Sequence, residues 1–273
     1  MRLFLVRHGE TVDNVAGLYA GVRDSPLTAH GVLQARRLGD HLAKQHQVTH
    51  VFSSDLQRAV DTAVKIVDAQ LSRRPRQNDK HGDAPGSGGT LKPLQLVDLR
   101  ERDFGSAEGK KFGTPHGDAE THEDMRQRAA RFVQGHLVPL LGSDDSETVV
   151  AVVVAHGLIL NSLFRVLQAR FGTEPRGSEA SAAWSNTGYL EAVIKAVTAD
   201  MEGSNAEDSG KRKTKQPQFM TVVGANVLRH LEGLKKTKGG IGNAQFDKRQ
   251  RTMDSFFGPA SKKPRVDRES KKS

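Results

Sequence analysis

The chain has 273 residues, enough for one domain with a sizeable core, but only 36% of them are hydrophobic, so part of the chain is expected to stay unpacked. It contains no cysteine, which excludes disulfide bonds and thiolate chemistry. Residues 201–273 hold 17 basic and 8 acidic side chains, whereas residues 1–200 hold 24 of each, so the whole net charge of +9 lies in the last part of the chain. A neutral domain with a basic tail is expected, which disfavours a folded, basic nucleic-acid-binding face.

The chain opens with a short strand and a helix. Residues 2–6 are almost all apolar, as expected of a buried strand, and this run is too short for a signal peptide. Thr28 is a suitable N-cap for a following helix. The apolar face of that helix is predicted to consist of Leu33, Ala35, Leu38 and Leu42.

A second strand and helix follow, and then an insertion. Residues 50–53 are predicted to form a strand, and Asp55 is expected to start a helix. Residues 72–90 are rich in Arg, Asp, Gly and Pro and are predicted to be a flexible surface insertion. The apolar residues that recur at helical spacing after Asp55 are Ala59, Ala63, Ile66 and Val67.

The middle of the chain continues this alternation. We predict a strand at 94–99, a helix at 122–140, a strand at 148–155 and a helix at 158–171. The strand at 148–155 is almost all Val and Ala, as expected of a strand buried on both faces. The alternation predicts an α/β fold, a three-layer sandwich with a mostly parallel central sheet flanked by helices.

The last third contains two more predicted strands and a tail. The strands, 184–192 and 218–223, are joined by a flexible charged loop at 200–217, and a final helix is predicted at 227–234. The remaining chain is basic and polar with little periodicity. We therefore divide the chain into a folded domain, 1–235, and a disordered basic tail, 236–273.

Polar clusters follow three of the predicted strands. They are Arg7-His8-Gly9-Glu10, the run from Ser53 to Arg58, and His156-Gly157. Because ligands of parallel sheets bind beyond the carboxyl ends of the strands, we expect these clusters to form one composite site.

The residue types in these clusters suit a phosphoryl group. Arg7 and Arg58 carry forked guanidinium groups that match phosphoryl oxygens. His8 can attack phosphorus if one ring nitrogen is free and the other is held by a hydrogen bond. His156 can donate a hydrogen bond to a phosphoryl oxygen, and Glu101, just past a predicted strand, can protonate the leaving alkoxide.

Five sequence blocks in this order resemble the histidine phosphatase superfamily, also called the phosphoglycerate mutase-like family. Arg-His-Gly alone would be a weak signal, but five blocks in order are specific. The resemblance covers roughly residues 1–195. The blocks are 5–11 with Asn14, 24–28 with Gly31, 53–59, 99–105 with Glu108, and 155–157.

The resemblance implies a phosphohistidine intermediate at His8. It implies that Glu101 first protonates the leaving group and then activates water. It implies no metal and no cofactor, and two arginines beside two histidines also make a poor cation site. The residues that it implies for phosphate and substrate binding are Arg7, Asn14, Arg58, His156 and Gly157.

The segment after the acid block departs from the family. Where the family often has Gly-Gly-Glu-Ser, this chain has residues 115–121, and the stretch from Gly109 to them is short. A short lid predicts an open, wet pocket, which favours transfer of the phosphoryl group to water, so we expect a phosphatase. A mutase or sugar bisphosphatase, and a catalytically inactive phosphate-binding relative, are the alternatives. The sequence identifies neither the substrate nor the oligomeric state.

The tail contains a second motif. Residues 250–257, Gln-Arg-Thr-Met-Asp-Ser-Phe-Phe, resemble the box with which proteins dock on the eukaryotic sliding clamp, proliferating cell nuclear antigen. A helical turn there would place Met253, Phe256 and Phe257 on one side as an apolar plug, with Gln250 at the rim. The alternatives are that these apolar residues are exposed by chance and bind no partner, or that the tail folds back on the domain.

Two basic clusters, 211–215 and 262–265, accompany this box. They are candidate signals for a nuclear import receptor, and they could also contact DNA weakly or serve only as solubilising charge. No apolar run is long enough to cross a bilayer, so no membrane contact is expected. Together with the box, the clusters favour a nuclear protein, with a cytoplasmic pool left open.

Overall fold

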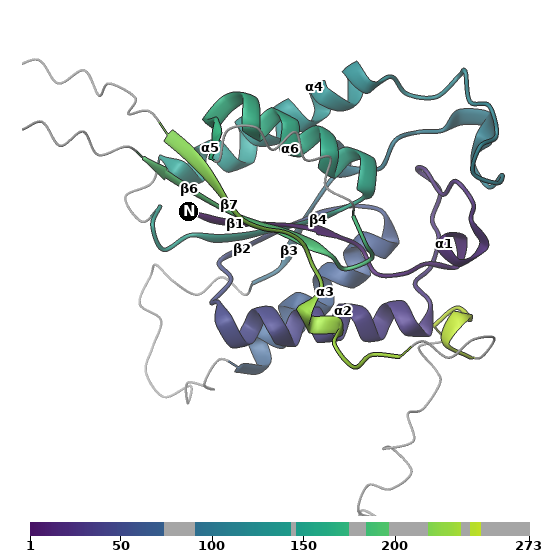
Figure 1. The fold of residues 1–273 in the computed structure, drawn as a ribbon, viewed down its shortest axis with the longest axis horizontal. Helices are drawn as coiled ribbons and strands as arrows, with labels where there is room; N and C mark the ends of the chain where they lie inside the picture. Colours follow the sequence, from purple (N-terminus) through teal and green to yellow (C-terminus); the bar gives the residue numbers. More distant parts are fainter. Residues whose placement is uncertain (74–90, 143–145, 175–183, 197–217, 236–240, 247–273) are drawn as a thin grey trace, which may run out of the picture.

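The computed structural model describes residues 1–73, 91–142, 146–174, 184–196, 218–235 and 241–246. At its centre lies a seven-stranded sheet with the spatial order β3-β2-β4-β1-β6-β7-β5 (Figure 1). Among the described strands, β6 alone is antiparallel to its neighbours β1 and β7, so the predicted mostly parallel sheet is confirmed. The strands are β1 (Arg2–Arg7), β2 (His50–Ser54), β3 (Pro93–Leu96), β4 (Val150–Ala155), β5 (Thr173–Glu174), β6 (Tyr189–Ala196) and β7 (Gln218–Val227).

Helices cover both faces of the sheet, which confirms the three-layer sandwich (Figure 1). One face carries α2 (Ala29–Gln45) and α3 (Gln57–Arg73). The other carries α6 (Gly157–Phe171) and a helical run made of α4 (His122–Phe132), a π-helical turn (Val133–Leu137) and α5 (Val138–Leu141). The short helix α1 (Val12–Ala16) lies directly after β1, at the carboxyl edge of the parallel strands.

Strand β4 shows why the sheet has two cores. Ala151, Val153 and Ala155 point into the cluster under α4 and α6, while Val152 and Val154 point into the cluster under α2 and α3. All five side chains are fully buried. Because successive strand residues face opposite sides, a strand that is apolar at every position must be covered twice, as predicted.

Three predicted elements differ from the structure. The strand expected at 94–99 ends at Leu96 and continues as a 3₁₀ turn (Val97–Leu99), because β3 lies at the edge of the sheet and pairs only with β2 among the described strands. The strand expected from Trp184 begins at Tyr189, because Thr187 has a positive φ of 58° that interrupts extended backbone. The helix expected at 227–234 is wrong: its first residue completes β7, which pairs with β6, and only one 3₁₀ turn (Arg229–Leu231) follows.

One predicted core residue is also wrong. Thr28 caps α2 as expected, its hydroxyl accepting a hydrogen bond from the Gly31 N–H at 2.9 Å. With the helix starting there, Val32 points inward and is 5% exposed, whereas Leu33 points outward and is 46% exposed. The remaining predicted positions, Ala35, Leu38 and Leu42, are buried, as are those of α3.

Six residues of the predicted tail, 241–246, lie among the described residues. Residues 241–246 form a 3₁₀ turn (Ile241–Asn243) and then run along the start of α2. The Ala29 N–H donates to the Ala244 carbonyl at 3.0 Å, which satisfies one of the first N–H groups of the helix. The first two residues of the predicted insertion, 72 and 73, belong to α3. The predictions that lie outside the described residues are the rest of the insertion, the loop 200–217, both basic clusters and the box 250–257.

Candidate active site

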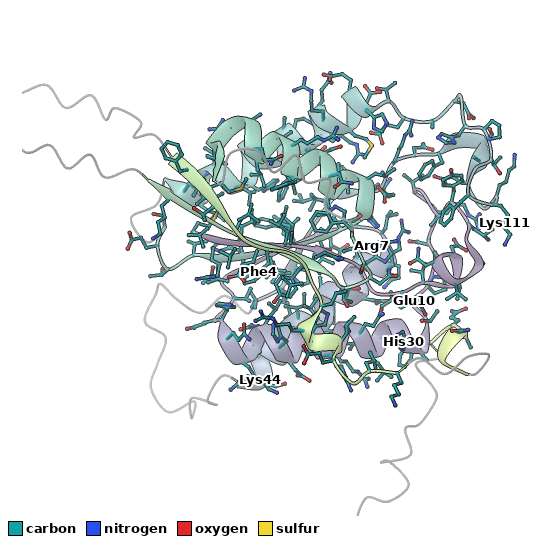
Figure 2. The ribbon with its side chains drawn as sticks, in the orientation of Figure 1. Phe4, Arg7, Glu10, His30, Lys44 and Lys111 are labelled. Atoms are coloured by element: carbon teal, nitrogen blue, oxygen red, sulfur yellow. The ribbon has the colours of Figure 1, made fainter. Side chains whose placement is uncertain are left out.

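The site begins where β1 ends, in a loop pressed against α2. A Cβ atom added to Gly9 would lie 2.6 Å from the Gly31 carbonyl oxygen, and one added to Gly31 would lie 2.1 Å from the Glu10 carbonyl oxygen. Both positions therefore need glycine. The Gly9 N–H also donates to the Thr62 hydroxyl of α3 at 3.0 Å. Figure 2 shows Arg7 and Glu10 at this end of the sheet, on the side of the molecule that carries Lys111.

His8 has one free ring nitrogen. Its Nδ1 lies 2.7 Å from the Gly9 carbonyl oxygen, which can only accept, so Nδ1 carries the proton and Nε2 keeps its lone pair. The side chain is only 4% exposed. The pKa of His8 lies well below its usual 6.5, mainly because the ring is buried and also because Arg58 and Arg7 carry positive charge nearby. A neutral imidazole with a bare Nε2 is the form that can attack phosphorus.

His156 has the opposite tautomer, because Arg58 donates from Nε to its Nδ1 at 3.2 Å. The ring proton then lies on Nε2, which is buried and has no hydrogen-bond partner among the described residues. Burial first, and then Arg58, lower the pKa of His156 well below 6.5, so the ring is neutral. The two imidazole rings lie 5.0 Å apart. The Nε2–H of His156 is therefore a donor held beside the His8 ring.

The two arginines are fixed by backbone carbonyl groups. Arg58 is 1% exposed and donates from its two terminal nitrogens to the carbonyl oxygens of Arg23 and Gly21, each at 2.7 Å. Arg7 donates to the Trp184 carbonyl oxygen at 2.5 Å, and its buried Nε has no partner among the described residues. Burial lowers the pKa of both guanidinium groups, which stay cationic at neutral pH.

Glu101 sits at the N-terminus of α6. Its carboxylate accepts hydrogen bonds from the backbone N–H groups of Leu158 at 3.2 Å and Ile159 at 3.3 Å. It also accepts one from the Arg102 N–H at 3.0 Å. Gly157, the first residue of the helix, lines the same space. The positive end of the helix dipole therefore points into the site, where it favours an anion.

Asn14 has a structural partner as well as a place in the pocket. It is the third residue of α1, and its Oδ1 accepts a hydrogen bond from the Thr11 N–H at 3.2 Å, while Thr11 caps the helix. Thr11 acts as a helix cap and does not line the pocket. Asn186, which sequence reasoning missed, donates to the Asn14 Oδ1 at 3.0 Å and to the His8 carbonyl oxygen at 3.2 Å.

These groups surround one pocket of about 440 Å³. Of the predicted catalytic residues, four line it, and His156 lies behind His8 and Arg58, fully buried. Asn14 and Gly157 line it as well. The rest of the wall was not predicted as part of the site and consists mainly of Leu18, Tyr19, Phe104, Phe112, Leu158 and Trp184.

The described residues contain no group of three or more histidine or acidic side chains placed to hold a metal ion. Within the same residues, no helix is long and apolar enough to cross a membrane. His116 packs its ring 5.4 Å from that of Tyr19 and 5.5 Å from that of Phe104, so it supports the pocket wall rather than lining the pocket.

The family model described as the histidine phosphatase superfamily, branch 1, matches residues 3–189, more than half of the chain. The chain belongs to this superfamily. The matched range starts in β1, ends at the first residue of β6 and includes every described residue that lines the pocket.

Curated relatives extend the match beyond this range. A Schizosaccharomyces pombe protein named a probable phosphatase is 28% identical over 265 residues, covering 92% of this histidine phosphatase and 78% of the relative. A Serratia proteamaculans protein named a probable phosphoglycerate mutase, GpmB, is 31% identical over 212 residues, covering 72% and 94%. A solved structure titled mycobacterial hydrolase 1 shares the fold with a TM-score of 0.61 at 21% identity, covering 83% of this chain and 99% of that one.

Proposed function

We propose that this histidine phosphatase hydrolyses phosphomonoesters through a phosphohistidine on His8, without a metal ion. One observation carries the proposal: the neutral His8 ring is held by Gly9 with Nε2 bare. Around it lie the buried guanidinium group of Arg58, the partly buried one of Arg7, and the Nε2–H of His156, which has no partner among the described residues. This is a set of fixed cations and donors around a nucleophile, as transfer of a dianionic phosphoryl group requires.

In the first step, the lone pair on His8 Nε2 forms the bond to phosphorus while the ester P–O bond breaks. The leaving alkoxide takes a proton from the carboxyl group of Glu101. Arg7, Arg58 and the His156 Nε2–H bind the phosphoryl oxygens and stabilise their charge. The products of this step are the free alcohol, a phosphohistidine and the Glu101 carboxylate.

In the second step, the Glu101 carboxylate takes a proton from a water molecule, whose oxygen attacks phosphorus. The N–P bond breaks, and its electron pair returns to His8 Nε2. Inorganic phosphate leaves, and both side chains regain their starting protonation. The cycle uses one water and needs no other reactant.

Hydrolysis rather than mutase activity is the preferred outcome. The segment between Gly109 and α4 is short, and its Phe112 side chain is 59% exposed, so little covers the mouth of the pocket. The relatives carry both kinds of name, phosphatase and mutase. A mutase must protect the phosphohistidine from water until the alcohol returns. Interconversion of phosphoglycerates faster than release of phosphate would show that the mutase alternative is correct.

The direct test is phosphate release by the purified chain with a chelator present, using a panel of phosphomonoesters. We expect turnover in the wild type and a loss of about 10³-fold or more in His8→Ala, because the nucleophile is gone. His122→Ala, an exposed histidine at the start of α4, is the matched control and keeps full activity. Activity that needs a divalent metal, or that survives in His8→Ala, contradicts the proposal. Phosphate binding without any turnover would identify the inactive relative.

We further propose that the tail tethers the enzyme to the sliding clamp in the nucleus. The support is the sequence pattern of Gln250, Met253, Phe256 and Phe257, with a basic cluster on either side of it along the chain. A peptide of residues 250–257 should bind the clamp, and its double variant Phe256→Ala, Phe257→Ala should not, because the apolar plug is removed. Equal binding of both peptides would refute the tether, and exclusion of the full chain from nuclei would refute the compartment.

A further inference from the structure

The pocket has two chemically different parts. The inner part holds the charged groups around His8. The outer part is built mainly from apolar and aromatic side chains. Two asparagines also line the pocket: Asn14, which Asn186 links to the His8 loop, and Asn161, which belongs to the outer part. The inner part suits a phosphoryl group, so the outer part must receive the alcohol portion of the substrate. Its composition therefore bears on which phosphomonoesters fit.

One wall of the outer part is an aromatic cluster centred on Tyr19. Its ring lies 4.4 Å from that of Phe104 and 5.0 Å from that of Phe112. The Tyr19 hydroxyl accepts a hydrogen bond from the Gly113 N–H at 3.0 Å, and the Phe112 N–H donates to the Gly17 carbonyl at 3.1 Å. Hydrogen bonds thus join the loop after α1 and the segment around Phe112 into one preformed wall.

Trp184 supplies a second aromatic surface. Its indole Nε1–H donates to the Asn161 Oδ1 at 2.8 Å. This hydrogen bond fixes the orientation of the ring and occupies the side-chain oxygen of Asn161. Its backbone carbonyl accepts the hydrogen bond from Arg7. The indole is therefore linked to the phosphate-binding end and is held in place without a ligand.

The outer part lacks a cation. Among the described lining residues, Arg7 and Arg58 are the cations, and both belong to the inner part. The basic residues of the neighbouring segment, Lys110, Lys111 and Arg102, do not line the pocket. Lys111 donates to the Ala16 carbonyl oxygen at 2.7 Å. Arg102 donates from Nε to the Glu120 carbonyl oxygen at 2.7 Å, and its guanidinium carbon lies 5.7 Å from the Phe104 ring centroid. A carboxylate or second phosphate on the substrate would lose water against aromatic rings and meet no cation in the described lining of the outer part, which is costly.

Building on the proposed function, we propose that the pocket selects phosphomonoesters whose alcohol portion is uncharged and apolar, above all aromatic, and discriminates against those with a second anionic group. Aromatic rings pack well on other aromatic rings. The proposal also gives a role to Phe112, a 59% exposed aromatic side chain at the pocket, whose free surface such a substrate would cover.

Three esters of primary alcohols test this selectivity: 2-phenylethyl phosphate, ethyl phosphate and 3-phosphoglycerate. We expect kcat/KM to be about tenfold higher for 2-phenylethyl phosphate than for ethyl phosphate, and lowest for 3-phosphoglycerate. The proposal is overturned if 3-phosphoglycerate is turned over as well as the phenylethyl ester.

Variants of Phe112 assign the selectivity to the wall. Phe112→Ala should lower kcat/KM for 2-phenylethyl phosphate about 3- to 10-fold and leave that for ethyl phosphate within about twofold. Phe112→Lys should raise kcat/KM for 3-phosphoglycerate at least about fivefold, because it adds the missing cation. Equal losses on both neutral esters in Phe112→Ala, with no gain in Phe112→Lys, would refute a role for this wall.

Binding to the His8→Ala variant separates this proposal from the proposed function, because it needs no turnover. Trp184 is the only tryptophan in the chain and lines the pocket, so its emission reports binding there, and the heat of binding provides a second readout. We expect 2-phenylethyl phosphate to bind about tenfold more tightly than 3-phosphoglycerate. Equal or reversed affinities would overturn the selectivity even if the enzyme is a phosphatase. The expected order with no wild-type turnover would instead refute only the catalysis.

Discussion

At the scale of single residues, the two neutral histidines of the site use their ring nitrogens in opposite ways. Gly9 holds the His8 proton on Nδ1 and leaves Nε2 bare, whereas Arg58 donates to the His156 Nδ1 and leaves the proton on Nε2. One ring can then attack phosphorus and the other can bind a phosphoryl oxygen. Arg58 has a double task, since it selects the tautomer of His156 and adds charge to the site.

This double task predicts the effect of Arg58→Lys. A lysine keeps the charge but cannot donate to the His156 Nδ1 and to two carbonyl groups in a planar fork, so kcat/KM should fall about 100-fold. Arg126→Lys, which changes an exposed arginine paired with Glu123, is the matched control and should have no effect. Steady-state phosphate release measures both. A change of less than about threefold in Arg58→Lys would show that charge alone matters at this position.

The charged half of the site could be predicted from sequence, and the apolar half could not. Arg7 is the last residue of β1, and His8 and His156 directly follow β1 and β4, where residue type and position already indicate chemistry. Phe112 lies in a loop whose place depends on pairing of distant segments, such as the bridge between Leu18 and Lys111. Asn186 precedes β6, the antiparallel strand, and only that direction brings it to the site. Polar residues before an antiparallel strand are the signal that could have found it.

At the scale of elements, the close contact between the loop after β1 and α2 predicts the effect of Gly31→Ala. The added methyl group would lie 2.1 Å from a backbone carbonyl oxygen that cannot move alone, so the variant should lose about 3 kcal/mol of stability. Gly135→Ala is the control, because nothing lies within 4 Å of its added methyl group, and it should be neutral or slightly stabilising. Urea denaturation measures both, and equal stability of the two variants would contradict the packing argument.

The sequence predicted a helix or strand correctly where its apolar residues followed a single pattern. Strand β4 and helix α6 follow directly from a continuous apolar run and from helical spacing. The predictions failed where backbone pairing with a segment distant in the sequence decided the structure. Val227 resembles the start of a helix in sequence but pairs with Tyr189 of β6. Residues 241–246 carry no periodic pattern, yet they pair with the start of α2, where the Ala29 N–H donates to the Ala244 carbonyl oxygen.

At the scale of the whole molecule, buried neutral histidines predict how stability depends on pH. Burial is the main cause that lowers the pKa values of His8, His156 and His230, and it lowers that of His230 to about 4. Between that value and the usual 6.5, the unfolded chain binds more protons than the folded one, so stability is complete above pH 6.5 and is lost as the pH falls. The slope is at most about 1.4 kcal/mol per pH unit for each histidine.

Urea midpoints measured at about pH 7 and about pH 5 test this dependence, with a lower midpoint expected at the acidic pH. His230→Gln, which keeps a polar partner for the Thr187 hydroxyl but does not titrate, should show a smaller drop between the two pH values. A midpoint that stays constant or rises at the lower pH would contradict the neutral, buried state of these rings.

Phosphorylation of His8 during turnover is the step on which the proposed mechanism depends. The most direct measurement is rapid quenching of the enzyme during hydrolysis of a ³²P-labelled phosphomonoester, followed by mapping of the labelled peptide. We predict label on the peptide that contains His8, stable in alkali and lost in acid as expected of a phosphohistidine, and no label in His8→Ala. Turnover without any covalent label, or with label on another residue, would show that His8 is not the nucleophile.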